Sequence, residues 1–140
     1  MGELVMTNEG RVVKILDVND DTCWSNFFKE HMEKFGCRVA TAADGDEGVL
    51  AALRELPDLI MMNYLMGRTD GIEATRLLRA YPHMRSVPII LYSARNDESL
   101  WTEALMAGCN EFLPIPFGFE AVRRLVKVYC GAHIGLPAWP

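Results

Sequence analysis

Short apolar runs recur along the chain at intervals that suit the strands of a buried sheet. They are rich in Val, Ile and Leu, as expected where helices cover both faces of a parallel sheet. The predicted strands span residues 12–18, 37–41, 59–62, 87–92 and 111–113. The run at 59–62, Leu-Ile-Met-Met, contains no polar residue, and we predict that it forms the central strand.

The segments between these runs carry apolar residues at steps of three and four, which is the spacing of an amphipathic helix. The first predicted helix has an N-cap at Asp21 or Thr22 and ends at Gly36. The second begins at Asp44 or Asp46. Short polar side chains at these positions can accept a hydrogen bond from the free N–H groups of the first turn.

The other predicted helices follow the same rule. The third begins at Gly71 and ends near Pro82, the fourth is capped by Asp97 and ends at Gly108, and the last follows Pro116. Five strands alternating with five helices require parallel pairing through right-handed crossovers. The predicted fold class is therefore α/β, a three-layer sandwich with a doubly wound five-stranded parallel sheet.

Length and composition indicate one domain. The chain has 140 residues, of which 50% are hydrophobic, and this is enough to bury a core. We expect a polar leader over residues 1–10, the domain over residues 11–130, and an irregular C-terminal tail over residues 131–140.

Charge and hydropathy exclude several classes of partner. The net charge of -5 gives no basic surface for nucleic acid, so we expect no direct nucleic-acid binding. No apolar run is long enough to cross a bilayer, and the first residues lack a basic flank followed by an apolar stretch; the predicted location is cytoplasmic, without membrane contact. The four cysteines and three histidines are too scattered for a zinc site or a redox dithiol.

Four segments resemble one known family. Residues 14–21, Lys-Ile-Leu-Asp-Val-Asn-Asp-Asp, are similar to the first strand and acidic pair of the receiver domain of bacterial two-component response regulators. Residues 57–71, 88–95 and 108–117 resemble, in order, its phosphoacceptor strand and loop, its fourth strand and its fifth strand. The resemblance covers residues 11–130 and implies the CheY-like, flavodoxin-like sheet with strand order 2-1-3-4-5.

The resemblance also implies a reaction. In this family a kinase phosphohistidine donates its phosphoryl group to an aspartate, an acidic cluster holds a divalent cation, and a lysine pairs with the phosphate. A hydroxyl on the fourth strand closes on the phosphate and an aromatic residue on the fifth strand rotates inward. The peptide bond before Pro116 is expected to be cis on the same grounds.

This sequence departs from that pattern where the reaction would occur. Asn19 and Asp20 correspond to the acidic pair, and Asn63 corresponds to the phosphoacceptor. Ser93 corresponds to the hydroxyl, Phe112 to the switch aromatic and Ile115 to the lysine. An amide cannot accept a phosphoryl group as a carboxylate does. The three losses at residues 19, 63 and 115 are mutually consistent, and they predict a degenerate phosphorylation site with no catalytic residue.

The same changes should weaken metal binding. Mg²⁺ prefers charged oxygen ligands, and only Asp20, with Asp21 nearby, remains to supply them. We therefore expect weak or absent Mg²⁺ binding and no cofactor. Removing two of three crowded carboxylates should also stabilise the fold, because each close pair repels by something on the order of 1–3 kcal/mol before solvent screening.

The first functional hypothesis is an atypical receiver, or pseudo-receiver, that acts as a phosphorylation-independent protein-interaction module in two-component-type signalling. Its partners would be proteins of a bacterial signalling pathway, or a second copy bound through the face formed by the fourth helix, fifth strand and fifth helix. Leu100, Trp101 and Met106 are the candidate contact residues there. Trp101 could equally pack over the sheet or under the C-terminal tail.

Two alternatives remain open. A small-ligand or anion sensor could use Arg68, Asn63 and Ser93 with nearby backbone N–H groups. A receiver with residual metal binding, or with phosphorylation at Asp20 or Asp21, is the other. An enzyme is not expected, because no base, nucleophile or ligand set accompanies the two adjacent aspartates.

Overall fold

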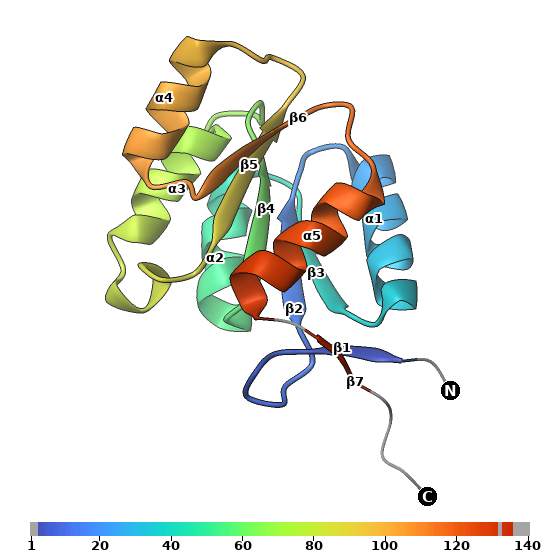
Figure 1. Ribbon diagram of the computed structural model, residues 1–140. Helices are drawn as coiled ribbons and strands as arrows, with labels where there is room; N and C mark the ends of the chain where they lie inside the picture. The colour runs from blue at the N-terminus through green and yellow to red at the C-terminus, as the bar shows by residue number, and fades with distance from the viewer. Residues whose placement is uncertain (1–2, 132, 136–140) are drawn as a thin grey trace, which may run out of the picture.

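A five-stranded parallel sheet forms the centre of the protein (Figure 1). The computed structural model describes residues 3–131 and 133–135. The strands lie in the order β3-β2-β4-β5-β6, which confirms the predicted order 2-1-3-4-5 when the strands of this sheet alone are counted. Their bounds are β2 Lys14–Val18, β3 Arg38–Ala42, β4 Leu59–Asn63, β5 Ile89–Ser93 and β6 Glu111–Pro114.

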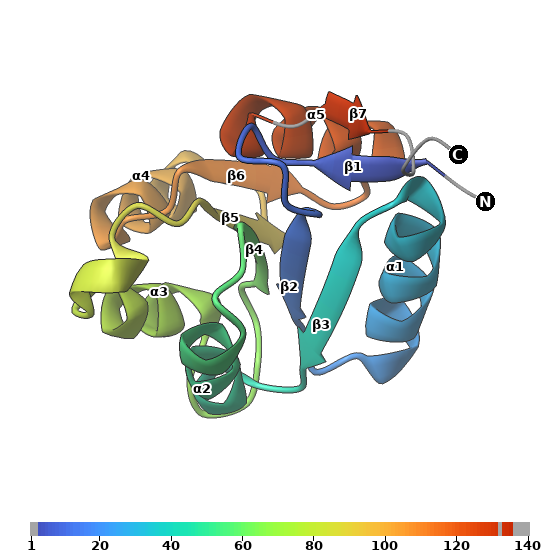
Figure 2. The ribbon, with the colours of Figure 1, turned by 90° about the horizontal axis from the view of Figure 1, so that it is seen from below.

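Helices cover both faces of the sheet, as predicted. Helices α1 (Thr22–Phe35) and α5 (Phe119–Cys130) lie on one face. Helices α2 (Gly45–Glu55), α3 (Gly71–Arg79) and α4 (Glu98–Ala107) lie on the other, with a 3-10 turn, η1 (Pro82–Met84), after α3 (Figure 2). The structure is thus a three-layer α/β sandwich.

The central strand β4 is buried on both faces. Successive side chains of a strand point to opposite sides, so Ile60 and Met62 pack in the core under α2, α3 and α4, whereas Leu59 and Met61 pack under α1 and α5. All four are fully buried. The absence of polar residues before Asn63 follows from this two-sided burial.

Aspartates begin four of the helices. Asp21, Asp44, Asp70 and Asp97 each accept a hydrogen bond from the backbone N–H three residues later. Where two candidates were open, the cap is the first of each pair rather than Thr22 or Asp46. Gly36 and Gly108 end α1 and α4 in the left-handed conformation, as their positions predicted.

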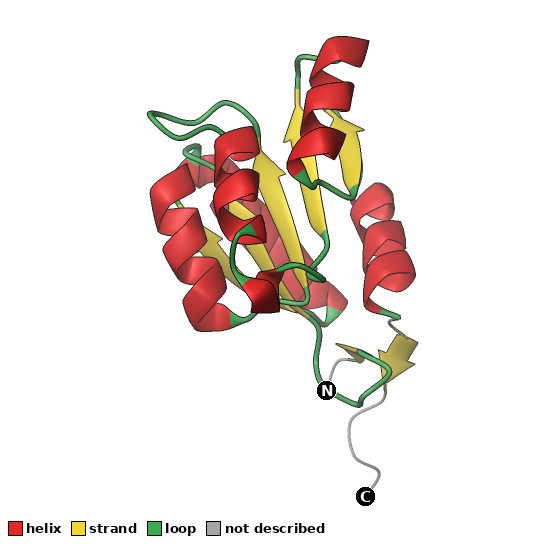
Figure 3. Cartoon of the chain, turned by 90° about the vertical axis from the view of Figure 1, so that its left-hand side faces the viewer, coloured by secondary structure: helices red, strands yellow, loops and turns green. Residues whose placement is uncertain are grey.

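The chain ends depart from the prediction. Residues Leu4–Met6 form strand β1, which pairs antiparallel with β7, His133–Gly135 (Figure 3). The expectation of an irregular tail is therefore wrong at residues 133–135, and the leader is not simply polar, because Val5 is buried in the core. Strands of only three residues are too short to show a periodic pattern of apolar residues in the sequence. Residues 136–140 lie outside the described part, and the boundaries at 11 and 130 stay a prediction.

Strand β1 is held against the end of α1, and this generates a stability prediction. Gly36 has φ 111°, and a Cβ built on it would lie 2.5 Å from the carbonyl oxygen of Glu3. We expect Gly36→Ala to lower the free energy of unfolding by about 1–3 kcal/mol, through left-handed strain and displacement of β1. Urea denaturation measures this. In a chain without residues 1–6 the penalty should shrink to the strain alone; an unchanged penalty would contradict the role assigned to β1.

Candidate functional site

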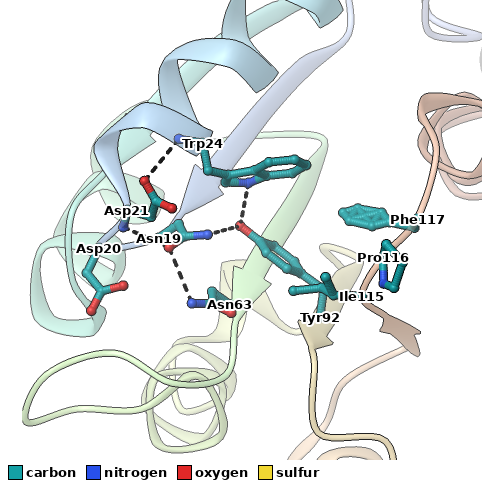
Figure 4. A pocket seen from close by; sticks show the side chains of 9 residues that line it. All are labelled: Asn19, Asp20, Asp21, Trp24, Asn63, Tyr92, Ile115, Pro116 and Phe117. Atoms are coloured by element: carbon teal, nitrogen blue, oxygen red, sulfur yellow. Dashed lines mark hydrogen bonds between the residues drawn. The ribbon is translucent and has the colours of Figure 1, made fainter.

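A cavity of about 350 Å³ opens at the carboxyl ends of the central strands (Figure 4). Parallel strands end at the same edge of a sheet, so the residues that follow β2 and β4 meet there with the segment after β6. The lining residues are Asn19, Asp20, Asp21, Trp24, Asn63, Tyr92, Ile115, Pro116 and Phe117.

Two amides meet where the strands β2 and β4 end. The Asn63 Nδ2 group donates to Asn19 Oδ1 at 3.3 Å and to the Leu65 carbonyl at 3.0 Å. Asn19 Oδ1 also accepts from the backbone N–H of Asp21 at 2.9 Å. Two carboxylates at these positions would have no hydrogen to share and would repel each other, whereas the amides bind directly.

A buried hydrogen-bond network continues behind the amides. Tyr92 Oη accepts from Asn19 Nδ2 at 3.0 Å and from Trp24 Nε1 at 3.1 Å, and it donates to Asp17 Oδ1 at 2.8 Å. Ser25 Oγ donates to Asp17 Oδ2 at 3.1 Å. The network joins β2, β5 and the first turns of α1 through side chains alone.

Burial controls the acidity of this network. Asp17 is 0% exposed, and desolvation raises the pKa of its carboxyl to about 7 even though its hydrogen bonds to Tyr92, Ser25 and Trp24 lower it. Burial, together with the neighbouring Asp17, also raises the pKa of the Tyr92 hydroxyl well above its ordinary value. The phenol therefore acts as a neutral donor to Asp17.

Aromatic and aliphatic side chains form the opposite wall. Phe117 lies 5.5 Å from Trp24 and 5.6 Å from Tyr92 between ring centroids, and Trp24 in turn stacks on Phe119 at 6.3 Å. Ile115, which the sequence resemblance matches to the family's lysine, is 40% exposed at the cavity. The Ile115–Pro116 peptide bond is cis, as expected.

The acidic residues lie at the rim rather than in the interior. Asp20 and Asp21 are both exposed, and one oxygen of Asp21 already accepts from the Trp24 backbone N–H as the cap of α1. Across residues 3–131 and 133–135, no three His, Cys, Asp or Glu side chains gather in a way that could hold a metal ion. This donor set is a poor fit to Mg²⁺, which needs several hard oxygen ligands.

The structure brings together five of the residues selected from the sequence: Asn19, Asp20, Asp21, Asn63 and Ile115.

Two other selected residues lie elsewhere. Ser93 is buried, and its Oγ accepts from the Arg95 backbone N–H at 3.0 Å instead of lining the cavity. The Arg68 side chain is 94% exposed and lies 4.0 Å from Asp46. An anion contact by Arg68 in this cavity therefore finds no support.

The α4 surface differs from its prediction in one residue. Trp101 is 44% exposed and packs on the half-buried ring of Phe112 at 5.8 Å, and Met106 is 83% exposed. Leu100 is fully buried, so its place in an exposed contact set is wrong. It lies on the buried stripe of α4, while Leu105 is 56% exposed and lies on the outer side.

Reasoning from the sequence did not identify Trp24, Tyr92, Phe117 and Asp17 as parts of the site. A signal existed for Asp17, since a carboxylate inside a strand buried on both faces requires partners. The aromatic wall had no such signal, because apolar residues in helices and strands are normally core.

Among the described residues, no helix combines the length and apolar character that a membrane crossing requires.

Comparison with known proteins identifies the family. Residues 15–127 match the response regulator receiver domain. The chain is 34% identical over 122 residues to the KDP operon transcriptional regulatory protein KdpE of Escherichia coli, covering 87% of this chain and 53% of that protein. It is 32% identical over 114 residues to the phosphate regulon transcriptional regulatory protein PhoB of Rhizobium meliloti, covering 81% and 50%.

Solved structures of receiver domains share the fold of this chain. The receiver domain of the sensor histidine kinase PA1611 of Pseudomonas aeruginosa superposes with a TM-score of 0.78 at 32% identity, covering 85% of this chain and 98% of that one. Chemotaxis protein CheY4 of Vibrio cholerae shares the fold, with a TM-score of 0.79 at 23% identity over 84% and 98% of the two chains.

The chain belongs to the response regulator receiver domain family. Receiver domains are non-enzymatic modules of two-component signal transduction. The chain spans about half the length of the two transcriptional regulators it matches.

The buried Asp17 predicts how stability depends on pH. Its pKa is raised from 3.8 to about 7 in the folded state, so the folded state binds the proton more tightly than the unfolded state. The contribution of Asp17 to stability should be highest below about pH 4, fall by up to about 4 kcal/mol as pH rises to about 7, and then level off. Asp17→Asn should remove most of this slope in urea denaturation series, whereas Asp20→Asn at the exposed rim should keep it. A wild-type slope in Asp17→Asn would refute the assignment.

Proposed function

We propose that this receiver domain is a pseudo-receiver, a phosphorylation-independent interaction module of two-component-type signalling in the bacterial cytoplasm. The observation that carries the proposal is the Asn63–Asn19 hydrogen bond at the end of the central strands. In the proposal, this neutral amide pair occupies the positions where the family's reaction needs a nucleophilic carboxylate and a charged metal ligand. Ile115 supplies no ammonium to neutralise a phosphate at the cavity.

We expect this chain to differ in metal binding from the sensor histidine kinase PA1611. Its receiver domain, at 32% identity, was solved with a magnesium ion coordinated in the active site cleft. In this chain, the described side chains at the corresponding edge offer two rim carboxylates and two amides that already bind each other. Weak metal binding at the rim and an amide at residue 63 would both support the proposed function.

Helix α4 presents an exposed apolar surface to a protein partner. Trp101, Leu105 and Met106 are exposed there, beside Phe112 of β6. Exposed apolar side chains grouped on one helix are typical of contact surfaces. We propose that this α4 surface binds a signalling protein or a second copy of the chain.

The phosphoryl-transfer part is tested with Mg²⁺ and acetyl phosphate. The wild type should gain no phosphoryl mass in intact-protein mass spectrometry, because no carboxylate is positioned as acceptor. The variant Asn19→Asp/Asn63→Asp should be less stable than wild type without metal, by about 1–3 kcal/mol, and Mg²⁺ should restore its thermal midpoint while leaving the wild type unchanged. A covalent adduct on Asp20 or Asp21 of the wild type would contradict the proposal.

The α4 surface is tested with a matched pair of variants. Met106→Glu changes an 83% exposed side chain, so folding should change by less than about 0.5 kcal/mol while self-association or partner binding is lost. Leu100→Ala empties a fully buried position and should cost about 2–5 kcal/mol of stability. Light scattering and partner capture measure association, and calorimetry measures stability. Unchanged association in Met106→Glu would remove α4 as the contact surface.

A further inference from the structure

The cavity at the strand ends has the size and wall chemistry of a small-molecule site. Its volume of about 350 Å³ lies in the range of ligand pockets. One wall is apolar and aromatic, with Trp24, Ile115 and Phe117, and the other is polar, with Asn63 and the rim acids (Figure 4). This division suits a ligand with one apolar end and one polar end.

The polar groups show which kind of polar end would fit. The side-chain donors at the cavity are engaged: Asn63 Nδ2 donates to Asn19 and Leu65, Asn19 Nδ2 and Trp24 Nε1 donate to Tyr92, and the Tyr92 hydroxyl donates to Asp17. Acceptors remain. Among the described residues, the structure gives no hydrogen-bond partner to Asn63 Oδ1, to either carboxylate oxygen of Asp20, or to the second oxygen of Asp21. These free acceptors favour a ligand that donates hydrogen bonds.

The charges of the lining residues further restrict which ligand the cavity can bind. Two carboxylates line the cavity, and no Lys, Arg or His does so. An anionic ligand would meet like charge and no cationic side chain. A protonated amine would meet the oxygens of Asp20, Asp21 and Asn63, and the rings of Trp24 and Phe117 would favour its positive charge and its apolar body.

We propose that this cavity binds a small organic monocation, a primary ammonium group on an aryl or alkyl body. The ammonium lies among Asp20, Asp21 and Asn63 Oδ1, and the body packs on Trp24, Ile115 and Phe117. The inference deepens the proposed function, on which it rests in one respect: the cavity is free of phosphoryl chemistry. A bare divalent cation is disfavoured because it would use only the acidic rim and leave the aromatic wall without a role.

The test is a ¹⁵N NMR titration of the full chain with 2-phenylethylamine at physiological ionic strength, which screens non-specific attraction. Saturable shifts are expected at the Trp24 indole and Asn63 side-chain signals. Two matched probes separate the contributions: 3-phenylpropionate carries the same ring with a negative charge, and methylammonium carries the charge without the ring. Neither should saturate these signals at the concentrations where 2-phenylethylamine does.

Variants locate the binding. Asp20→Asn should weaken the binding of 2-phenylethylamine about two- to fivefold, which is the range expected for one exposed ion pair. Ile115→Lys brings a positive charge to the cavity, which repels the ammonium group and should weaken the binding of 2-phenylethylamine about tenfold or more. Glu30→Gln removes one negative charge from the exposed side of α1 and should change nothing. The spectrum of each variant shows whether it is folded.

Several outcomes would overturn the proposal. They are equal or tighter binding of 3-phenylpropionate, the same shifts from methylammonium or Mg²⁺ alone, no saturation with 2-phenylethylamine, or an unaffected Ile115→Lys variant. The readout is independent of phosphorylation. A failed titration with no phosphoryl adduct leaves the pseudo-receiver proposal standing, whereas an adduct on the wild type removes that proposal whatever the amine does.

Discussion

The hydrogen bonds that run from Asn63 through Asn19 and Tyr92 to Asp17 tie three strands together at one edge of the sheet. Each link joins a donor to an acceptor, so no ion is needed to hold the ends of β4, β2 and β5 in place. Carboxylates at positions 63 and 19 would break the first link, because neither has a hydrogen to give. The neutral amide pair is therefore a stable alternative to a charged, metal-bridged edge rather than a simple loss.

The position of Asp17 follows from the geometry of β2. Residues two apart on a strand share a face, so Asp17 and Asn19 both point toward the α1 and α5 side, where Tyr92 also lies. Asp17 is thus sealed behind the tyrosine instead of lining the cavity. The only carboxylates among the lining residues are Asp20 and Asp21 at the rim, and the interior of the network carries a carboxyl whose burial favours the protonated form.

Local rules were enough to predict most of the fold. The caps at Asp21, Asp44 and Asp97 follow from residue type, and the alternation of strands and helices predicted the parallel sheet. The strand order and the meeting of Asn19 with Asn63 were expected from the family resemblance. The aromatic wall could not be predicted, since it arises where α1 packs beside the segment that leads into α5. The pairing of β1 with β7 depends on contacts between the two ends of the chain. Leu100 was a misread helical phase: it shares a stripe with other buried residues of α4, and the outer side belongs to Leu105 and Met106.

The separation between the cavity and the α4 surface limits how a signal could pass. A ligand shifts a conformational equilibrium only through contacts that differ between the two states. Ser93 Oγ is engaged with the Arg95 backbone away from the cavity lining, and Phe112 packs on Trp101. Neither of them touches the cavity as a lining residue. The lining residues with helical contacts are Trp24 of α1 and Phe117, which leads into α5, and they pack on each other at 5.5 Å. A ligand in the cavity would therefore act most directly on α1 and α5, and we expect ligand binding and association through α4 to vary independently.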